Sequence, residues 1–378
     1  MKDMGRQIKI STTVVFTLLL ITQSLHAQDE ILFRRHLINS GINGLFYGIA
    51  IDVIAGVDGG AAGGIPIIAA GTSVLVPLLT NSSRTISQNS MILSAHGKIV
   101  GWEHGFAIAT LVGGENAWND GANIKLTIAA GALTSISLGI VGSTLGKNVN
   151  WTEGQVAIYR QYGWIMPFTG VSLMAAISDE PRLWAASDLI FGTGGYFLAD
   201  KVYKNYQFTR GDVRAIRVLS VLNGGLGYGI LADKSSRSDF TRSDLLFPAL
   251  GALSGTLIGQ AWLKNVNLSL RQGMQTAYAA TGGAVIGFGI ALLTGSDNAT
   301  PYYVIPYITG LGAYAIAVES MRKNNKIQAF LGDSHKNNWE IAFMPQNVYL
   351  NSLISQNGFR LKGRSAGMQP VFAASLSF

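Results

Sequence analysis

The sequence contains no cysteine among its 378 residues, and only 13% of those residues are charged. The lack of cysteine excludes disulfide bonds, thiol catalysis, cysteine metal sites and a lipid-modified N-terminal cysteine. Soluble domains carry about 25% charged residues. The low charge, combined with 48% apolar residues and 46 glycines, is typical of a membrane-embedded or very densely packed helical protein. The formal net charge of +7 is too small and too dispersed to predict binding to nucleic acid.

Motifs of catalysis and cofactor binding are also scarce. The pattern His-Glu-x-x-His does not occur, and His96 and His104 are eight residues apart without further ligand spacing. The segment 142–147 partly matches a phosphate-binding loop, but Val141 replaces its first glycine and Asn148 replaces its Ser/Thr. We therefore predict a protein that is not an enzyme and that has no metal or other cofactor.

The first 27 residues have the three-part pattern of a secretory signal peptide. Lys2, Arg6 and Lys9 precede an uncharged apolar run over residues 11–22, and Ala27 ends a segment that signal peptidase would cleave. The apolar run is too short for a good membrane span. We therefore predict export to the outer membrane or periplasm of a Gram-negative type bacterium, with the inner membrane as the less favoured location.

A pair of lysine and asparagine recurs along the chain at intervals of 57, 60 and 59 residues, beginning at Lys147, Lys204, Lys264 and Lys323. Such spacing indicates stacked copies of one supersecondary unit. The predicted copies lie near residues 36–92, 93–149, 150–206, 207–266 and 267–326. Their first helices are predicted to open near Ser40, Gly97, Gly154, Gly211 and Gly273. Sixteen residues after each opener stands a glycine, at Gly56, Gly113, Gly170, Gly227 and Gly289.

Each copy is predicted to form two helices. Copies three to five open with a Ser or Thr followed three residues later by Gln or Asp, which is the spacing of a capping box: Thr152 and Gln155, Thr209 and Asp212, Ser269 and Gln272. The long apolar segments do not alternate as strands do. Glycines recur in them at spacings of three and four, and each costs about 1 kcal/mol relative to alanine in an exposed helix. Close helix packing offsets that cost, either in a soluble helical array or in lipid.

Charges differ between the two kinds of loop. Turns inside the hairpins are mainly acidic, as at Asp58 and Asp297, whereas junctions between hairpins are mainly basic, as at Arg35 and Lys147. With an exported N-terminus and paired helices, the basic edge would face away from the cytoplasm, against the positive-inside tendency. This charge pattern disfavours an ordinary ten-span transporter of the inner membrane.

The C-terminal tail, residues 327–378, is predicted to be rich in β-structure. Apolar residues alternate in its last segment, at Phe372, Ala374, Leu376 and Phe378. This ending resembles the terminal strand by which bacterial outer-membrane barrel proteins are recognised. A small antiparallel cap over the last hairpin is the alternative, and a whole barrel would need many more alternating strands.

Four charged residues are candidate functional positions. Arg160 and Arg217 each stand six residues after an opener glycine, and Glu103 stands in the same position of copy two. Charges inside apolar helices line a polar cavity or pair with one another, here with Glu103 or Asp188. A long side chain of this kind also reaches the nearby helix end in many proteins.

The sequence thus predicts a mainly α fold of five tandem glycine-rich helical hairpins, about ten helices over residues 28–326, with a short C-terminal β segment. The predicted function is a non-enzymatic cell-envelope protein with a membrane-associated structural or binding role. The alternative is a membrane transporter or channel in which Arg160, Arg217 and Glu103 face a central path. Lipid or another envelope protein is the expected partner. The sequence specifies no small-molecule ligand.

Overall fold

The computed structural model describes residues 28–80, 87–119, 121–236, 241–296, 298–331, 338–343, 360–361, 364–365 and 372–377. The predicted signal peptide and Phe378 lie outside the described residues. The chain divides into two units, Met1–Val318 and Glu319–Phe378. The larger unit carries all of the candidate functional residues.

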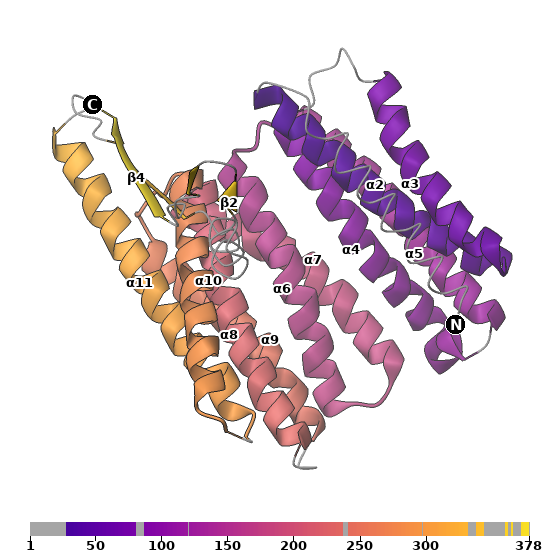
Figure 1. Ribbon diagram of the computed structural model, residues 1–378. Coiled ribbons are helices and arrows are strands. Elements are labelled where there is room, and N and C mark those ends of the chain that lie inside the picture. The colour runs from indigo at the N-terminus through magenta and orange to yellow at the C-terminus, as the bar shows by residue number, and fades with distance from the viewer. Residues whose placement is uncertain are drawn as a thin grey trace. The chain divides into compact units, whose positions relative to one another are not determined.

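The described residues form ten α-helices and two 3₁₀ helices, so the prediction of a mainly helical fold is confirmed. In Figure 1 the helices of the larger unit lie side by side. Their bounds are α2 (Gln28–Ala55), α3 (Gly60–Thr80), α4 (Gln88–Gly113), η1 (Gly114–Trp118), α5 (Gly121–Asn148), α6 (Glu153–Ile177), α7 (Pro181–Tyr206), α8 (Arg210–Ser236), η2 (Arg242–Leu245), α9 (Leu246–Leu263), α10 (Leu270–Leu293) and α11 (Thr300–Leu331).

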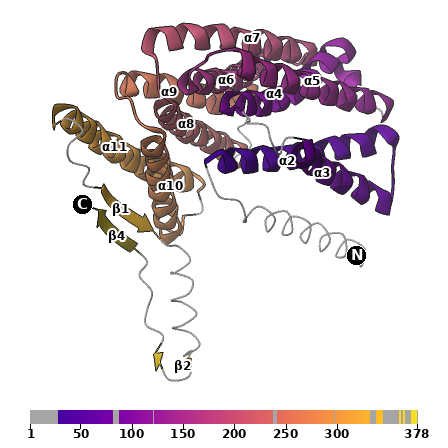
Figure 2. The same cartoon turned by 90° about the horizontal axis from the view of Figure 1, so that it is seen from above.

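Consecutive helices pack as pairs, in agreement with a tandem hairpin arrangement. The most extensive helix contacts are those of α2 with α3, α4 with α5, α6 with α7 and α8 with α9. Figure 2 shows α2 beside α3 and α8 beside α9. In the last pair, α10 touches α11 where a β-carbon on Gly283 would meet Thr309 and Ala313. Successive pairs are joined by contacts of α4 with α7, α6 with α8 and α8 with α10.

The predicted caps begin α6, α8 and α10. The backbone N–H of Gln155 donates to Thr152 Oγ1 (3.1 Å), and that of Gln272 donates to Ser269 Oγ (3.2 Å). Thr209 and Asp212 form both bonds of a capping box, because Asp212 N–H donates to Thr209 Oγ1 and Thr209 N–H donates to Asp212 Oδ2. Each bond satisfies a donor that the first helical turn leaves free.

Neighbouring copies are tied together at these caps. Thr209 Oγ1 donates to the carbonyl of Leu268 (2.6 Å), and Leu268 N–H donates to Asp212 Oδ1 (2.9 Å). A β-carbon on Gly154 would overlap the carbonyl of Phe208, and one on Gly211 would overlap that of Leu268. The starts of α6, α8 and α10 therefore lie next to one another, at one end of the bundle.

The first two copies differ from the prediction in where their helices start. α2 begins at Gln28 and α4 at Gln88, rather than near Ser40 and Gly97. The N-cap of α4 is Ser87, whose Oγ accepts the backbone N–H of Ser90. The predicted boundary after residue 92 consequently falls inside α4. The Gln or Asp that marks the later caps is replaced here by Ser90, so glycine spacing alone set the predicted register.

Glycines allow the backbones of α4 and α5 to touch. A β-carbon on Gly101 would overlap the backbone of Ser135, and one on Gly105 would overlap that of Ala130. From the other side, a β-carbon on Gly142 would overlap the carbonyl of Leu93. Such contact is characteristic of small residues at helix interfaces in membranes.

The five glycines predicted at one repeat position have different surroundings. Gly56 follows α2 with φ +68°, and Gly113 is the last residue of α4. Gly170 packs against Phe191, and Gly227 lies on the backbone of Phe247. A β-carbon on Gly289 would have no described heavy atom within 4 Å. Depending on the copy, the glycine at this position ends a helix, packs against a neighbouring helix or lies on an exposed helix face.

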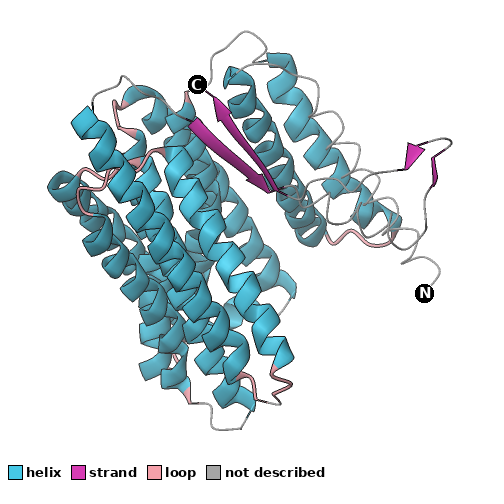
Figure 3. Cartoon of the chain, turned by 60° about the vertical axis from the view of Figure 1, so that its left-hand side comes forward, coloured by secondary structure: helices cyan, strands magenta, loops and turns pink. Residues whose placement is uncertain are grey.

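After α11 the structure describes four short strands: β1 (Asn338–Phe343), β2 (Arg360–Leu361), β3 (Arg364–Ser365) and β4 (Phe372–Ser377). β1 pairs with β4 in antiparallel register, Asn338 opposite Ser377, and β2 pairs with β3. Figure 3 shows the two longer strands as a pair. Because much of the predicted tail lies outside the described residues, a β-rich tail over 327–378 stays a prediction.

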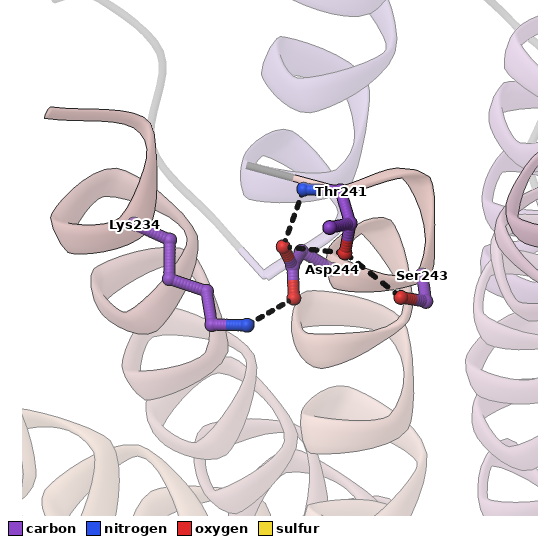
Figure 4. Close-up of polar contacts among 4 residues, drawn as sticks. All are labelled: Lys234, Thr241, Ser243 and Asp244. Atoms are coloured by element: carbon purple, nitrogen blue, oxygen red, sulfur yellow. Dashed lines mark hydrogen bonds and ion pairs between the residues drawn. The ribbon is translucent and has the colours of Figure 1, made fainter. Parts of the chain in front are cut away.

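A polar network closes the turn between α8 and α9. Asp244 is 2% exposed and accepts from Lys234 Nζ (2.6 Å) and from the backbone N–H of Thr241 (2.7 Å). Thr241 Oγ1 also donates to Asp244 and lies 2.9 Å from Ser243 Oγ (Figure 4). The buried carboxylate thereby fixes the start of η2.

We expect Gly101→Ala to destabilise the bundle and Gly289→Ala to leave it unchanged or slightly more stable. The methyl group at 101 would force α4 and α5 apart, and overpacking of this kind costs about 1–3 kcal/mol. At position 289 alanine meets open space and has the better helix propensity. The thermal midpoint of the detergent-purified protein, followed by tryptophan fluorescence, measures both. Equal midpoints for the two variants would contradict direct backbone contact.

Candidate functional site

Some helices of the bundle, most clearly α5 and α10, bury small and polar residues and expose large apolar ones. In α5 the buried residues are Thr127, Gly131, Ser135, Gly139, Gly142 and Gly146. On the outer side of the same helix, Leu133 is 66% exposed and Ile140 is 62% exposed. α10 repeats this distribution: Thr276 and Gly283 are buried, and Leu293 is 88% exposed. Water-soluble helices bury the opposite face.

Six helices in the described part of the chain are long and apolar enough to cross a membrane. The segments are Phe33–Ala55, Gly60–Leu79, Gly121–Asn148, Arg242–Leu263, Leu270–Leu293 and Thr300–Lys323. The other four, α4, α6, α7 and α8, contain the charged candidate residues. The side chains that make these four helices more polar meet inside the bundle.

Two polar layers join α4 to α7. In the first layer, His96 Nε2 and the Tyr196 hydroxyl are 3.0 Å apart, and His96 is 4% exposed. In the second, His104 Nδ1 donates to Asp188 Oδ2 at 2.8 Å. Eight helical residues separate the layers on each helix, which is about 12 Å. The helices run antiparallel, so one polar track follows their common face.

Glu103 extends the second layer. Its carboxyl group interacts with that of Asp188. Two neighbouring carboxyl groups repel each other when both are ionised, so a proton shared between them is favoured. Asp188 therefore contacts His104 on one side and Glu103 on the other. This layer can hold and exchange a proton between three side chains.

Glycines on α6 and α7 border both layers. A β-carbon on Gly163 would lie 2.6 Å from His96 Nε2 and 3.0 Å from the Tyr196 ring. One on Gly192 would lie 2.7 Å from the ring of His104. The close approach of these two helices holds the imidazole rings in place.

Arg217 continues the polar interior toward α9. Its Nε donates to Gln161 Oε1 (3.0 Å), and Gln161 Nε2 donates to Thr256 Oγ1 (3.1 Å). Gln161 is 2% exposed. Three helices, α6, α8 and α9, therefore share one chain of hydrogen bonds around a guanidinium group.

The structure brings the predicted candidates together in two groups. Glu103 meets Asp188, whereas Arg160 and Arg217 act on each other and on His96. Within the described residues neither arginine forms an ion pair, so pairing with Glu103 or Asp188 is not observed. The buried Arg160 Nε and His96 Nδ1 also have no described hydrogen-bond partner.

Glu103 lies at a different level along the bundle axis from Arg160 and Arg217. Arg160 and Arg217 each lie eight residues after their caps, Thr152 and Thr209. Glu103 lies sixteen residues after the cap of its helix, Ser87, and His96 takes the level of the arginines. Glu103 differs in level from the arginines because α4 begins at Gln88, earlier than the glycine spacing predicts.

A row of arginines leads to this group from the helix start. Arg210, Arg214 and Arg217 are spaced by four and three residues, which places them on one face of α8. Arg210 pairs with Glu153 (3.1 Å), and Arg214 is exposed. The charges of Arg210 and Arg214 act on Arg160. Like charges thus converge here from two helices.

Sequence reasoning missed the partners of the histidines. His96 and His104 were considered only as a metal pair, whereas α7 supplies Tyr196 and Asp188 to them separately. The spacing of eight residues on α4 matches that on α7, and this was the available signal. Among the described residues, no group of three His, Cys, Asp or Glu is placed to hold a metal ion.

One motif lies outside this site. Residues 363–367 match the pattern Gly-x-Ser-x-Gly of serine hydrolases, with Ser365 in β3. That pattern indicates a nucleophile only on a turn from a strand into a helix. The glycines flanking β3 lie outside the described residues, and the motif carries no functional assignment.

Comparisons with protein-family models, with curated proteins and with solved structures found no match. The class of protein is therefore defined by its own features: a mainly helical chain with six helices apolar enough to cross a membrane. The polar track between α4 and α7 and the arginines of α6 and α8 are its candidate functional site.

We expect His104 and Asp188 to stabilise the fold jointly. Removing either partner leaves a buried polar group unpaired, at a cost of about 1–3 kcal/mol. A double-mutant cycle of His104→Ala and Asp188→Ala, measured by unfolding in mixed micelles, should give a coupling free energy of about 1–3 kcal/mol. The matched control is the cycle for Asp200 and Lys204, an ion pair whose lysine is 72% exposed. Similar coupling in both cycles would contradict the buried contact.

Proposed function

We propose that this protein is embedded in a membrane and that its bundle binds a ligand through its polar interior. The observation that carries the proposal is the distribution of side chains on helices such as α5 and α10, where many large apolar residues are exposed and the buried residues are small or polar. In water, an apolar surface of this extent would promote aggregation. In lipid, the same residues are solvated, and small residues permit the close packing that holds helices together.

Helix length supports the same conclusion. The six apolar segments contain between 20 and 28 residues, and a membrane core about 30 Å thick needs about 20 helical residues. In the four more polar helices, Glu103 interacts with Asp188 and Arg160 with Arg217, inside the bundle. This is the arrangement in which a membrane tolerates ionisable side chains.

A non-enzymatic role in the cell envelope fits this arrangement best. The signal peptide over residues 1–27 and location at the outer membrane or periplasm remain part of the proposal, because the leader pattern is independent of the helices. The strand β4, followed by Phe378, keeps its resemblance to an outer-membrane targeting strand. Lipid or another envelope protein is the proposed partner.

We expect cysteine labelling to report lipid around the bundle. The chain has no cysteine, so Ile140→Cys and Val285→Cys each introduce a single thiol on an exposed apolar face. In open membrane fragments, a membrane-impermeant maleimide should not label them. Asn298→Cys, in the turn between α10 and α11, is the control that should be labelled.

Washing the same membranes with alkaline carbonate should leave the protein in the pellet. Labelling of positions 140 and 285 as fast as position 298, together with release into the wash, would overturn the membrane proposal. Release alone would show that any lipid contact is peripheral.

Transport is the second candidate function, and the polar track favours it. Five polar side chains line the common face of α4 and α7 over about 12 Å: His96, Tyr196, His104, Asp188 and Glu103. Carboxyl and imidazole groups in such a series are the components of proton pathways in pumps and transporters. The basic junctions speak against an ordinary inner-membrane topology but not against transport as such.

If the track conducts protons, Glu103→Gln should slow proton flux into liposomes to the rate of protein-free vesicles. The substitution removes the carboxyl that shares a proton with Asp188. A pH-sensitive dye trapped in the vesicles measures the flux after a pH jump. Glu115→Gln, in η1, is the control expected to behave as the unmodified protein. Flux in Glu103→Gln equal to that of the unmodified protein would contradict a proton path through Glu103, and flux in the unmodified protein no faster than in protein-free vesicles would leave the binding role alone.

A further inference from the structure

Among the described residues, Arg160 on α6 and Arg217 on α8 have no counter-charge paired with them. Arg160 and Arg217 are partly buried, and the charged side chains that act on them are arginines: Arg210 and Arg214 on the first, Arg160 and Arg214 on the second. Arg217 has a neutral partner in Gln161. Desolvated cations that only repel one another are costly. A bound anion would remove that cost.

Unused hydrogen-bond capacity lies in the same place. Arg160 Nε is buried and has no described acceptor, and the guanidinium group offers five N–H donors in all. His96 is buried with a free Nδ1, and Arg160 and Arg217 are the first two charges that act on it. Buried polar groups in proteins are almost always satisfied. The guanidinium group of Arg160 can only donate, so the partner that its Nε lacks is an acceptor.

Arg160, Arg217 and His96 lie near the junction end of the bundle, from which an anion could reach them. Arg160, Arg217 and His96 lie eight or nine residues after the caps of α6, α8 and α4, which is about 12–14 Å from the junction end. Arg210 and Arg214 line the face of α8 between that end and Arg217. Arg214 is exposed, and Arg210 is held by Glu153. A row of cations draws anions inward and concentrates them at its end.

We propose that Arg160, Arg217 and His96 form a binding site for an oxyanion, such as a phosphate or carboxylate group, that enters along the arginine face of α8. A planar guanidinium group matches two oxygens of such an anion, which a lone chloride does not offer. The site rests on the proposed binding role of the bundle interior. The oxyanion is carried either by a free solute or by the phosphate of a lipid headgroup.

The test measures binding to the full-length protein in nanodiscs of neutral phosphatidylcholine and in detergent. Radiolabelled inorganic phosphate and acetate are the soluble probes, and nanodiscs containing phosphatidylglycerol are the lipid probe. We expect saturable binding to at least one probe. Arg217→Gln and Arg160→Gln should each weaken it about tenfold or more, because each removes a charge-assisted hydrogen bond. Arg242→Gln is the matched control, since Arg242 is 57% exposed and paired with Asp179.

The thermal unfolding midpoint is a second measurement, and it remains informative when a variant does not bind the oxyanion. In chloride buffer without oxyanion, Arg217→Gln should melt at a higher temperature than the unmodified protein, because it relieves repulsion. Added oxyanion should raise the midpoint of the unmodified protein and not that of the variant. Arg217→Lys should keep part of the binding, since it retains the charge without the planar fork.

Two results would overturn the site: absence of binding to all three probes, or binding that Arg217→Gln and Arg160→Gln leave unchanged. Preference for phosphatidylglycerol over free phosphate and acetate would assign the oxyanion to lipid, and the opposite preference to a solute. Retention in carbonate-washed membranes is independent of these results. Loss of anion binding alone therefore leaves the membrane proposal standing.

Discussion

Close contact between helix backbones is the constraint on which the rest of this structure depends. At the α4–α5 interface the atoms that meet are main-chain atoms of Gly101 and Ser135, and the hydroxyl of Ser135 donates to the carbonyl of Lys98. An interface made this way buries little apolar side-chain area. It therefore gains little from the hydrophobic effect in water. Large apolar side chains of α5 instead lie on its outer surface, where the proposed membrane would solvate them.

The polar interior follows from the same packing. Helices that touch through glycine leave their longer polar side chains no route to water, so these must find partners within the bundle. His104 finds Asp188 and His96 finds Tyr196, each across the α4–α7 interface. The second layer is complete, with a carboxyl pair and an imidazole. In the first layer, by contrast, Arg160 Nε and His96 Nδ1 have no described hydrogen-bond partner. The proposed anion site lies at this layer.

The repeat explains both what is shared and what differs along the chain. Thr209, Asp212 and Leu268 form the bonds that link one copy to the next, and such residues report architecture. Function resides where copies differ. The row of Arg210, Arg214 and Arg217 on α8 is not repeated on α10. Counted from the cap Ser269, the equivalent positions hold Leu270, Met274 and Ala277, and the first turn has the single arginine Arg271. The repeated residues form the shared architecture of the hairpins, and the charged residues are found at positions that differ between copies.

Local chemistry of the sequence was sufficient to predict the helices and three of their caps, because a cap needs only residues that are three apart. It also identified Arg160, Arg217, Glu103 and Asp188 as unusual charges in apolar helices. The register of α4 depended on Ser87, whose role is visible only once its hydroxyl is seen to accept from Ser90. Which charges meet was decided by the crossing of α4 with α7 and of α6 with α8. Those crossings depend on contacts between residues that are 56 to 100 positions apart, and no local pattern encodes them.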